Sequence, residues 1–238
     1  MNDAFHMAAS GMSAVARMLD VAARNAVNAN TPGYVSRELA THSFLKELDI
    51  QLGREGSYLE TTETSKFTQG TIVPSDDPTH VALDGPGFLV LRGPNGPLYT
   101  RDGKLRVSPE GLLSTHAGMA VMGESGPIRI DLQAGSGVRI DDQGRVYQGQ
   151  LEVGRLKLVE FADRNLLERV GETMFRAPDR AAPVAAQETR IVAESLEFPA
   201  EKSVISMVRM IEASKAFEAQ QRVIRTLSRT YENLIRNQ

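Results

Sequence analysis

The chain has 238 residues, with 27 Lys and Arg, 30 Asp and Glu, a formal net charge of −3 and no cysteine. This length can bury a core in one or two domains, and the charge balance gives no reason to expect nucleic acid as a partner. The lack of cysteine excludes disulfides, Cys-ligated zinc and a thiol nucleophile. No window reaches the roughly 18 apolar residues that a membrane span needs, so we expect no lipid-embedded segment.

Residues 1–34 predict a helix with a narrow seam, followed by a turn. Small and apolar side chains recur in alternating steps of four and three, the spacing of a coiled-coil-like helix face. Asn25 and Asn28 continue this face with polar groups, which fix register more than they add stability. The residues of the seam are Met7, Gly11, Ala14, Met18, Val21, Asn25 and Asn28.

A turn ends this helix and sets the direction in which the chain leaves it. Pro32 cannot extend a helix, and Gly33 suits the positive φ of a type II turn. We expect the turn, like the seam, to take part in packing between subunits; it comprises Asn30, Thr31, Pro32, Gly33 and Tyr34. The N-terminus lacks the basic start and continuous apolar run of a cleaved secretory signal, so we expect no such signal.

The middle of the chain predicts β structure between two connecting segments. Residues 35–78 predict an extended arm or connector, polar and rich in Thr in its second half. Residues 79–175 contain short β-prone runs such as GFLVL, LYTR, LRVS, LLST, IRID, VRID and LKLVEF, separated by turn sequences such as GPNG and DQG. This spacing is typical of antiparallel hairpins in a sandwich or barrel-like domain. Residues 176–198, rich in Ala and Pro, predict a linker.

Residues 199–238 predict a second long helix, because neither Pro nor Gly interrupts the chain after Ala200. Apolar residues again recur in steps of three and four. The residues expected to pack are Met210, Ala213, Phe217, Ile224, Leu227, Tyr231 and Leu234. We therefore predict an α+β fold, in which long N- and C-terminal helices pack as a coiled-coil-like pair and a central domain is rich in antiparallel β structure.

No arrangement of residues indicates catalysis, a metal or a cofactor. The pairs Asp76-Asp77 and Asp141-Asp142 lie beside Pro or Gly, where Asp commonly accepts hydrogen bonds from its own backbone in a turn. The glycine-rich segments lack the patterns that cradle phosphate. The four histidines have no second ligand at metal-binding spacing; they are His6, His42, His80 and His116. We therefore expect a protein that is not an enzyme.

Three segments carry the motifs of a known family. ARNAVNANTPGYVSRE, at 23–38, is similar to an N-terminal motif in which an Asn-rich tract leads into Asn-Thr-Pro-Gly-Tyr. Residues 81–130 resemble hairpins with Gly-Phe-Phe, Tyr-Thr-Arg-x-Gly and Gly-x-Leu, and the segment from Ser195 resembles a closing helix with a Leu-Glu start. These are motifs of the flagellar axial proteins that form the rod and hook. GESGPIRI and GRLKLVEF are most similar to the proximal-rod members, with the distal-rod members second.

The resemblance implies a structural role in the bacterial flagellum. Rod subunits of this family are exported through the flagellar type III apparatus and assemble helically, with copies of themselves and with other rod proteins, in the periplasmic part of the basal body. Their terminal helices line the inner core, which serves as drive shaft and export channel wall, and their β-rich domain lies outside.

Two other classes of function stay open on the residues alone. One is a secreted or surface adhesion module, in which the β-rich domain binds a ligand and the helices only oligomerise. The other is a hydrolase with an unrecognised site. Assembly without a ligand would favour the rod subunit, and saturable turnover would favour the hydrolase.

Overall fold

The computed structural model describes residues 2–42, 60–201 and 203–236, and the side chains of 10–39, 62–201, 203–226 and 228–229. The chain divides into two compact units. The helical unit comprises Met1–Asn28, Arg37–Thr64 and Glu201–Gln238, and the β unit comprises Ala29–Ser36 and Ser65–Ala200. The short segment 29–36, which follows the first helix, thus belongs to the β unit.

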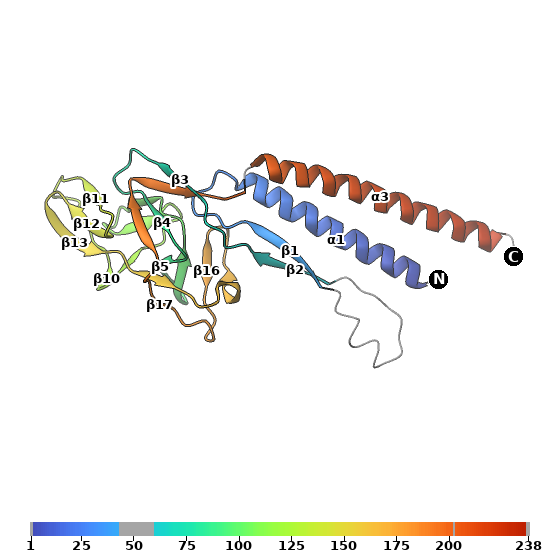
Figure 1. The fold of residues 1–238 in the computed structure, drawn as a ribbon, viewed down its shortest axis with the longest axis horizontal. Coiled ribbons are helices and arrows are strands. Elements are labelled where there is room, and N and C mark those ends of the chain that lie inside the picture. The colour runs from blue at the N-terminus through green and yellow to red at the C-terminus, as the bar shows by residue number, and fades with distance from the viewer. Residues whose placement is uncertain (1, 43–59, 202, 237–238) are drawn as a thin grey trace. The chain divides into compact units, whose positions relative to one another are not determined.

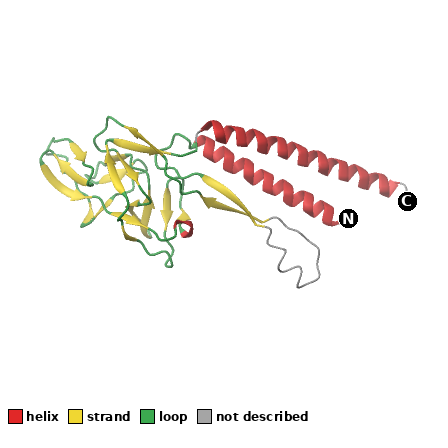
Figure 2. Cartoon of the chain, in the orientation of Figure 1, coloured by secondary structure: helices red, strands yellow, loops and turns green. Residues whose placement is uncertain are grey.

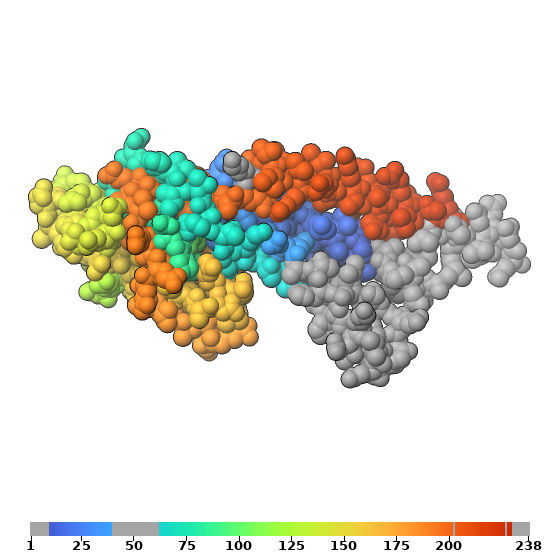
Figure 3. Space-filling view, viewed as in Figure 1, coloured from blue at the N-terminus to red at the C-terminus, as the bar shows by residue number. Residues whose placement is uncertain are grey.

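The helical unit is built on two helices that lie side by side, α1 (Asn2–Val27) and α3 (Ser203–Arg236) (Figures 1 and 3). Val21 and Ala22 of α1 and Ser206 and Ala213 of α3 are buried. The two helices contact at Gly11, where an added Cβ would lie 3.4 Å from the side-chain amide of Gln220. No described helix is long and apolar enough to cross a membrane.

The predicted fold class is wrong. The described chain is mostly β structure, with nineteen short strands and α-helices only near its two ends (Figure 2). The helices pack, but a coiled coil is not shown: Met18, a residue of the predicted seam, is 52% exposed, whereas Ala22, outside the seam, is buried. A coiled coil needs its seam residues to interlock over successive heptads, and a periodic apolar stripe alone does not ensure that.

Two strands complete the helical unit. β1 (Arg37–His42) pairs with β2 (Glu60–Ser65) in a two-stranded sheet. Arg37, whose side chain is buried, donates to Glu63 at 2.5 Å. Residues 43–59 of the predicted arm lie outside the described residues.

The β unit is centred on a six-stranded antiparallel sheet, and its other strands form small sheets around it (Figures 1 and 2). The order in the large sheet is β15 (Glu168–Arg169), β16 (Met174–Arg176), β6 (Gly96–Thr100), β5 (Phe88–Gly93), β14 (Leu158–Glu160) and β17 (Val184–Ala185). A three-stranded sheet contains β11 (Val138–Ile140), β12 (Arg145–Gln148) and β13 (Leu151–Arg155).

Four further pairs of strands complete the β unit, two between neighbouring segments and two between distant ones. β7 (Leu105–Val107) pairs with β8 (Leu113–Thr115), and β9 (Met122–Gly123) with β10 (Gly126–Pro127). β3 (Thr71–Pro74) pairs with β19 (Ser195–Phe198), and β4 (Val81–Asp84) with β18 (Arg190–Ala193). The segment predicted as a linker, 176–198, therefore includes three paired strands. A 3-10 turn, η1 (Arg164–Leu166), follows β14.

Strand β5 separates two hydrophobic clusters. Its residues alternate, so that Leu89 and Leu91 join an aliphatic cluster, whereas Phe88 and Val90 join an aromatic one. Because successive side chains of a strand point to opposite faces, the continuous apolar run of this strand shows that both of its faces are buried. In the aromatic cluster Phe88 packs edge-on against Phe161 with ring centroids 5.7 Å apart.

Candidate subunit-packing site

The turn after α1 is held by the β unit. The backbone N–H of Gly33 donates to the Glu197 carbonyl at 2.8 Å, and the Tyr34 N–H closes the turn onto Thr31 at 3.2 Å. Gly33 has a φ of +67°, as the Thr-Pro-Gly sequence predicts. A Cβ on Gly33 would lie 2.1 Å from the Asp102 nitrogen. Only glycine fits this close contact between two backbones.

Tyr34 and Val35 are fixed by one arginine of the same unit. Tyr34 is buried, and the guanidinium carbon of Arg169 lies 5.4 Å from the centre of its ring, within the range of a cation–π contact. Arg169 also donates to the Val35 carbonyl at 2.6 Å and to the Ser65 hydroxyl at 3.1 Å. The predicted turn is thereby positioned as part of the β unit.

Asn25 is a structural residue of the helical unit. Its amide donates to the Arg37 carbonyl at 2.8 Å and accepts from the Arg37 N–H at 2.9 Å. The residue is 3% exposed. Asn28, the next polar residue of the seam, donates to the Arg24 carbonyl at 3.0 Å. The two asparagines thus bond backbone groups of their own unit.

The structure places the other predicted packing residues at different depths. Val21 and Ala213 are buried. Met18 and Asn30 are exposed. The residues of intermediate exposure are Gly11, Ala14, Asn28, Thr31, Pro32, Met210, Phe217 and Ile224. The side chains of Met7, Leu227, Tyr231 and Leu234 lie outside the part that the structure describes.

The first turns of α3 carry apolar side chains on two opposite faces. Ser206, Met210 and Ala213 form the covered face. Val204, Val208 and Ile211 follow the i, i+4, i+7 spacing of a second face, and all three are exposed, Val208 by 49% and Ile211 by 53%. Contiguous exposed apolar patches mark interaction sites on soluble proteins.

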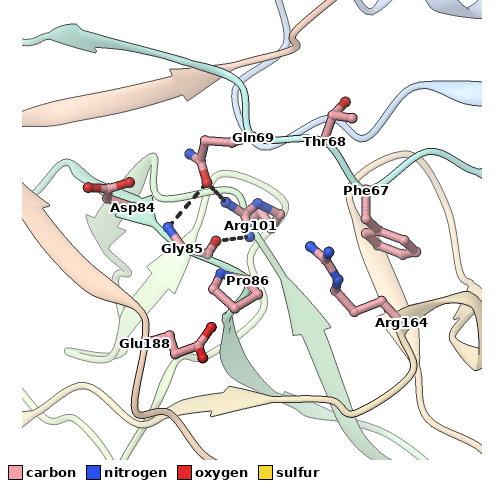
Figure 4. A pocket seen from close by; sticks show the side chains of 9 residues that line it. All are labelled: Phe67, Thr68, Gln69, Asp84, Gly85, Pro86, Arg101, Arg164 and Glu188. Carbon is pink, nitrogen blue, oxygen red and sulfur yellow. Dashed lines mark hydrogen bonds between the residues drawn. The ribbon is translucent and has the colours of Figure 1, made fainter.

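An ion pair at the centre of the β unit was not predicted. The Arg101 guanidinium donates to Glu197 at 2.9 and 3.1 Å, and both side chains are buried. Arg101 also donates to Gln69 at 3.0 Å and to the Gly85 carbonyl at 2.9 Å (Figure 4). It donates to the Gly87 carbonyl at 2.9 Å as well.

Burial raises the pKa of the Glu197 carboxyl, and the charge of Arg101 offsets part of this rise. Both residues occur in motifs that carry the family resemblance: Arg101 is the Arg of Tyr-Thr-Arg, and Glu197 is the Glu of Leu-Glu. Their place in these motifs was the signal in the sequence that could have indicated their role.

Two of the aspartates predicted to lie in turns accept hydrogen bonds from residues of the same turn. Asp77 accepts from the N–H and hydroxyl of Thr79, at 2.9 and 2.7 Å, and Asp141 accepts from the Gln143 N–H at 2.9 Å. His80 shares a 2.7 Å hydrogen bond with Ser75, and burial lowers its pKa. Within the described residues, no group of three or more His, Asp or Glu side chains is arranged to bind a metal.

Comparisons with known proteins agree on one family. Residues 82–148 match the family described as flagellar hook protein FlgE/F/G D1 domain, and residues 202–237 match the flagellar basal body rod FlgEFG protein C-terminal family. The chain is 30% identical over 225 residues to the flagellar basal-body rod protein FlgF of Caulobacter vibrioides, covering 92% of this chain and 91% of the relative.

Two further relatives carry the same kind of name. The FlgF of Salmonella typhimurium is 31% identical over 239 residues, covering 94% of this chain and 93% of the relative. The flagellar basal-body rod protein FlgG of Buchnera aphidicola is 26% identical over 187 residues, covering 70% and 71%. Both matched families and all three relatives are thus flagellar axial proteins.

Proposed function

Because the chain belongs to the family of flagellar basal-body rod proteins and is most similar to the members named FlgF, we propose that it assembles helically through α1 and α3. It is a structural subunit of the rod and is located in the flagellar basal body. Its partners there are other rod proteins. The family's named members are structural proteins, so a non-enzymatic role follows from the family.

The exposed apolar face of α3 carries the proposal. Val204, Val208 and Ile211 are exposed although the opposite face of the same helix is covered. Burial of apolar surface stabilises by about 25 cal/mol per Å², so a second helix laid on this face would gain substantially. Contacts of this kind that do not close into a ring generate a helical tube.

The predicted packing residues take two roles in this proposal. Those on the helices contribute to the inner core of the tube, and those of the turn set where the chain enters the β unit. The similarity to FlgF supports a position in the proximal rod, and family membership supports export through the flagellar type III apparatus.

Substitutions on α3 test the assembly mode. We expect Val208→Lys and Ile211→Lys to abolish incorporation into basal bodies, because a charged side chain would have to be buried without a partner. Ala216→Lys, at an exposed position outside this face, introduces the same side chain and is the control. Basal bodies are isolated from cells that express each variant, and the subunit is quantified by immunoblot. Normal incorporation of both test variants would reject assembly through this face.

A further inference from the structure

One pocket of the β unit contains an arginine whose guanidinium has no polar partner in the described part of the chain. The pocket has a volume of about 370 Å³, and Phe67, Pro86, Arg101 and Arg164 lie in its wall. Figure 4 shows the Arg164 guanidinium pointing into the space between Phe67 and Pro86. Its carbon lies 5.8 Å from the centre of the Phe67 ring. Among the described residues, its guanidinium makes no hydrogen bond or ion pair.

The second guanidinium of this pocket is already occupied. Arg101 directs its donors to Glu197, Gln69 and the carbonyls of Leu83, Gly85 and Gly87. It therefore has no capacity for another acceptor of comparable strength. Anion recognition in the pocket would fall to Arg164 alone.

The environment of Arg164 favours an added anion. Burial and the charge of Arg101 both lower the pKa of Arg164. A partly desolvated charge without a counterion is costly, and pairing offsets that cost. A guanidinium binds a carboxylate with two parallel hydrogen bonds, and the faces of Phe67 and Pro86 could flank the methylene groups of an acidic side chain.

Two carboxylates limit which anion can enter. Asp84 and Glu188 also line the pocket, and no ion pair joins either to Arg164 in the described part of the chain. Their charge disfavours anions of high charge, such as a phosphate group. A single carboxylate carries only one negative charge, so these two residues repel it less than a phosphate group while it can still pair with Arg164.

We propose that the Arg164 pocket binds one carboxylate side chain, Asp or Glu, of an adjoining rod subunit. This inference rests on the proposed function for the source of the carboxylate. The pocket would act as a specific contact between β units, separate from the apolar contacts of α3. It would fix the rotation of one subunit against the next, because a bidentate pair constrains both distance and angle.

Binding of a carboxylate is tested on the whole chain in solution. N-acetyl-glutamate amide is titrated into ¹⁵N-labelled protein, and N-acetyl-glutamine amide is the neutral control probe. We expect the glutamate probe to shift the signals of Thr68 and the Arg164 Nε–H, and Arg164→Gln to weaken binding about tenfold or more. Equal shifts with both probes, or no shift at these residues, would overturn the carboxylate assignment.

The source of the carboxylate is tested in the rod. Arg164→Gln is expected to reduce incorporation into basal bodies at least tenfold with an unchanged melting temperature, and Arg164→Lys to restore part of it. Arg92→Gln makes the same chemical change at an exposed position of β5 and is the control.

The two assays also separate the possible failures. Normal incorporation of Arg164→Gln would overturn the subunit contact. If the wild-type chain nevertheless binds the glutamate probe and Arg164→Gln does not, the ligand is a free small carboxylate. If the wild-type chain and Arg92→Gln were both absent from basal bodies, the proposed function itself would fail.

Discussion

The side-chain amide of Asn25 satisfies both backbone polar groups of Arg37, accepting from its N–H at 2.9 Å and donating to its carbonyl at 2.8 Å. The amide therefore replaces a neighbouring strand at the first residue of β1. Within the helical unit, this pair of hydrogen bonds ties the last turns of α1 to the strand that follows. An aspartate could supply the acceptor but not the donor.

Asn25→Ala should loosen the start of β1. The Arg37 N–H and carbonyl would lose their partners in a buried site, and a buried unsatisfied group costs about 1–3 kcal/mol. The measurement is amide hydrogen exchange of Arg37, which we expect to accelerate at least tenfold. Asn30→Ala, at an exposed position, is the control and should leave that exchange rate unchanged. Equal protection of Arg37 in wild type and Asn25→Ala would contradict this role.

Gly33→Ala should destabilise the β unit and not merely redirect the chain. The added methyl carbon would lie 2.1 Å from the backbone nitrogen of Asp102. Because the atom that it meets belongs to the backbone, one of the two backbone segments would have to move. Gly118 is the control that lacks the steric contact. It also has a positive φ, of +81°, but no atom of the described residues lies within 4 Å of its Cβ position. Gly118→Ala should cost only the conformational strain, about 1 kcal/mol.

The two glycine variants are compared by urea unfolding, followed by the near-ultraviolet circular dichroism of the tyrosines. This probe reports mainly on the β unit, which contains Tyr34, Tyr99 and Tyr147. A loss of stability for Gly33→Ala no larger than that for Gly118→Ala would show that the backbone contact relaxes at little cost.

Local sequence predicted the hairpins because strand, turn and partner lie within a few residues. GPNG joins β5 to β6, and the register pairs Gly93 with Gly96. The pairings of β4 with β18 and of β3 with β19 had no such indication, since they join Asp84 to Arg190 and Pro74 to Ser195. Short segments of polar or mixed composition that lie so far apart in sequence become strands only when the tertiary fold pairs them.

The packing residues were harder to predict than the elements that carry them. Periodicity identifies an apolar stripe, but it does not say which part of the stripe is covered, and Met18 is exposed in a seam where Val21 is buried. The central ion pair shows a second limit. Among 27 basic and 30 acidic residues, composition cannot indicate that Arg101 and Glu197 meet in the core, because their elements are remote in sequence.

Removing one member of this ion pair should strongly destabilise the β unit. Arg101→Met would leave the Glu197 carboxylate buried without its counterion and the carbonyls of Gly85 and Gly87 without a donor. Breaking a buried pair in this way costs about 3–5 kcal/mol.

Arg155→Met is the matched control for the ion pair. Arg155 makes a looser pair with Glu124 at 3.8 Å, and both side chains are exposed. Exposed pairs contribute about 0–1 kcal/mol. The measurement is urea unfolding with the same tyrosine probe, and similar losses for both variants would indicate that the central pair contributes no more than a surface contact.

Glu160 should make one loop of the β unit sensitive to acid. Its Oε1 accepts hydrogen bonds from the N–H groups of Gln187, Glu188 and Thr189, at 3.2, 3.0 and 2.9 Å, and from the Thr189 hydroxyl at 2.7 Å. Burial acts to raise the pKa of Glu160, but these hydrogen bonds outweigh it, so that the pKa lies below its ordinary value of 4.5.

The sign of the pH dependence follows from that lowered pKa. The stabilisation is fully present above pH 4.5, the ordinary value, and is lost as the pH falls through the folded-state pKa, because protonation removes the charge that accepts these bonds. We expect the Thr189 amide proton signal to shift between pH 6 and pH 3, as the carboxylate of Glu160 titrates. Glu160→Gln should abolish this shift, since a neutral amide does not titrate in this range, whereas Glu168→Gln, at an exposed residue of β15, should retain it. A Thr189 shift that survives in Glu160→Gln would assign the acid sensitivity to another group.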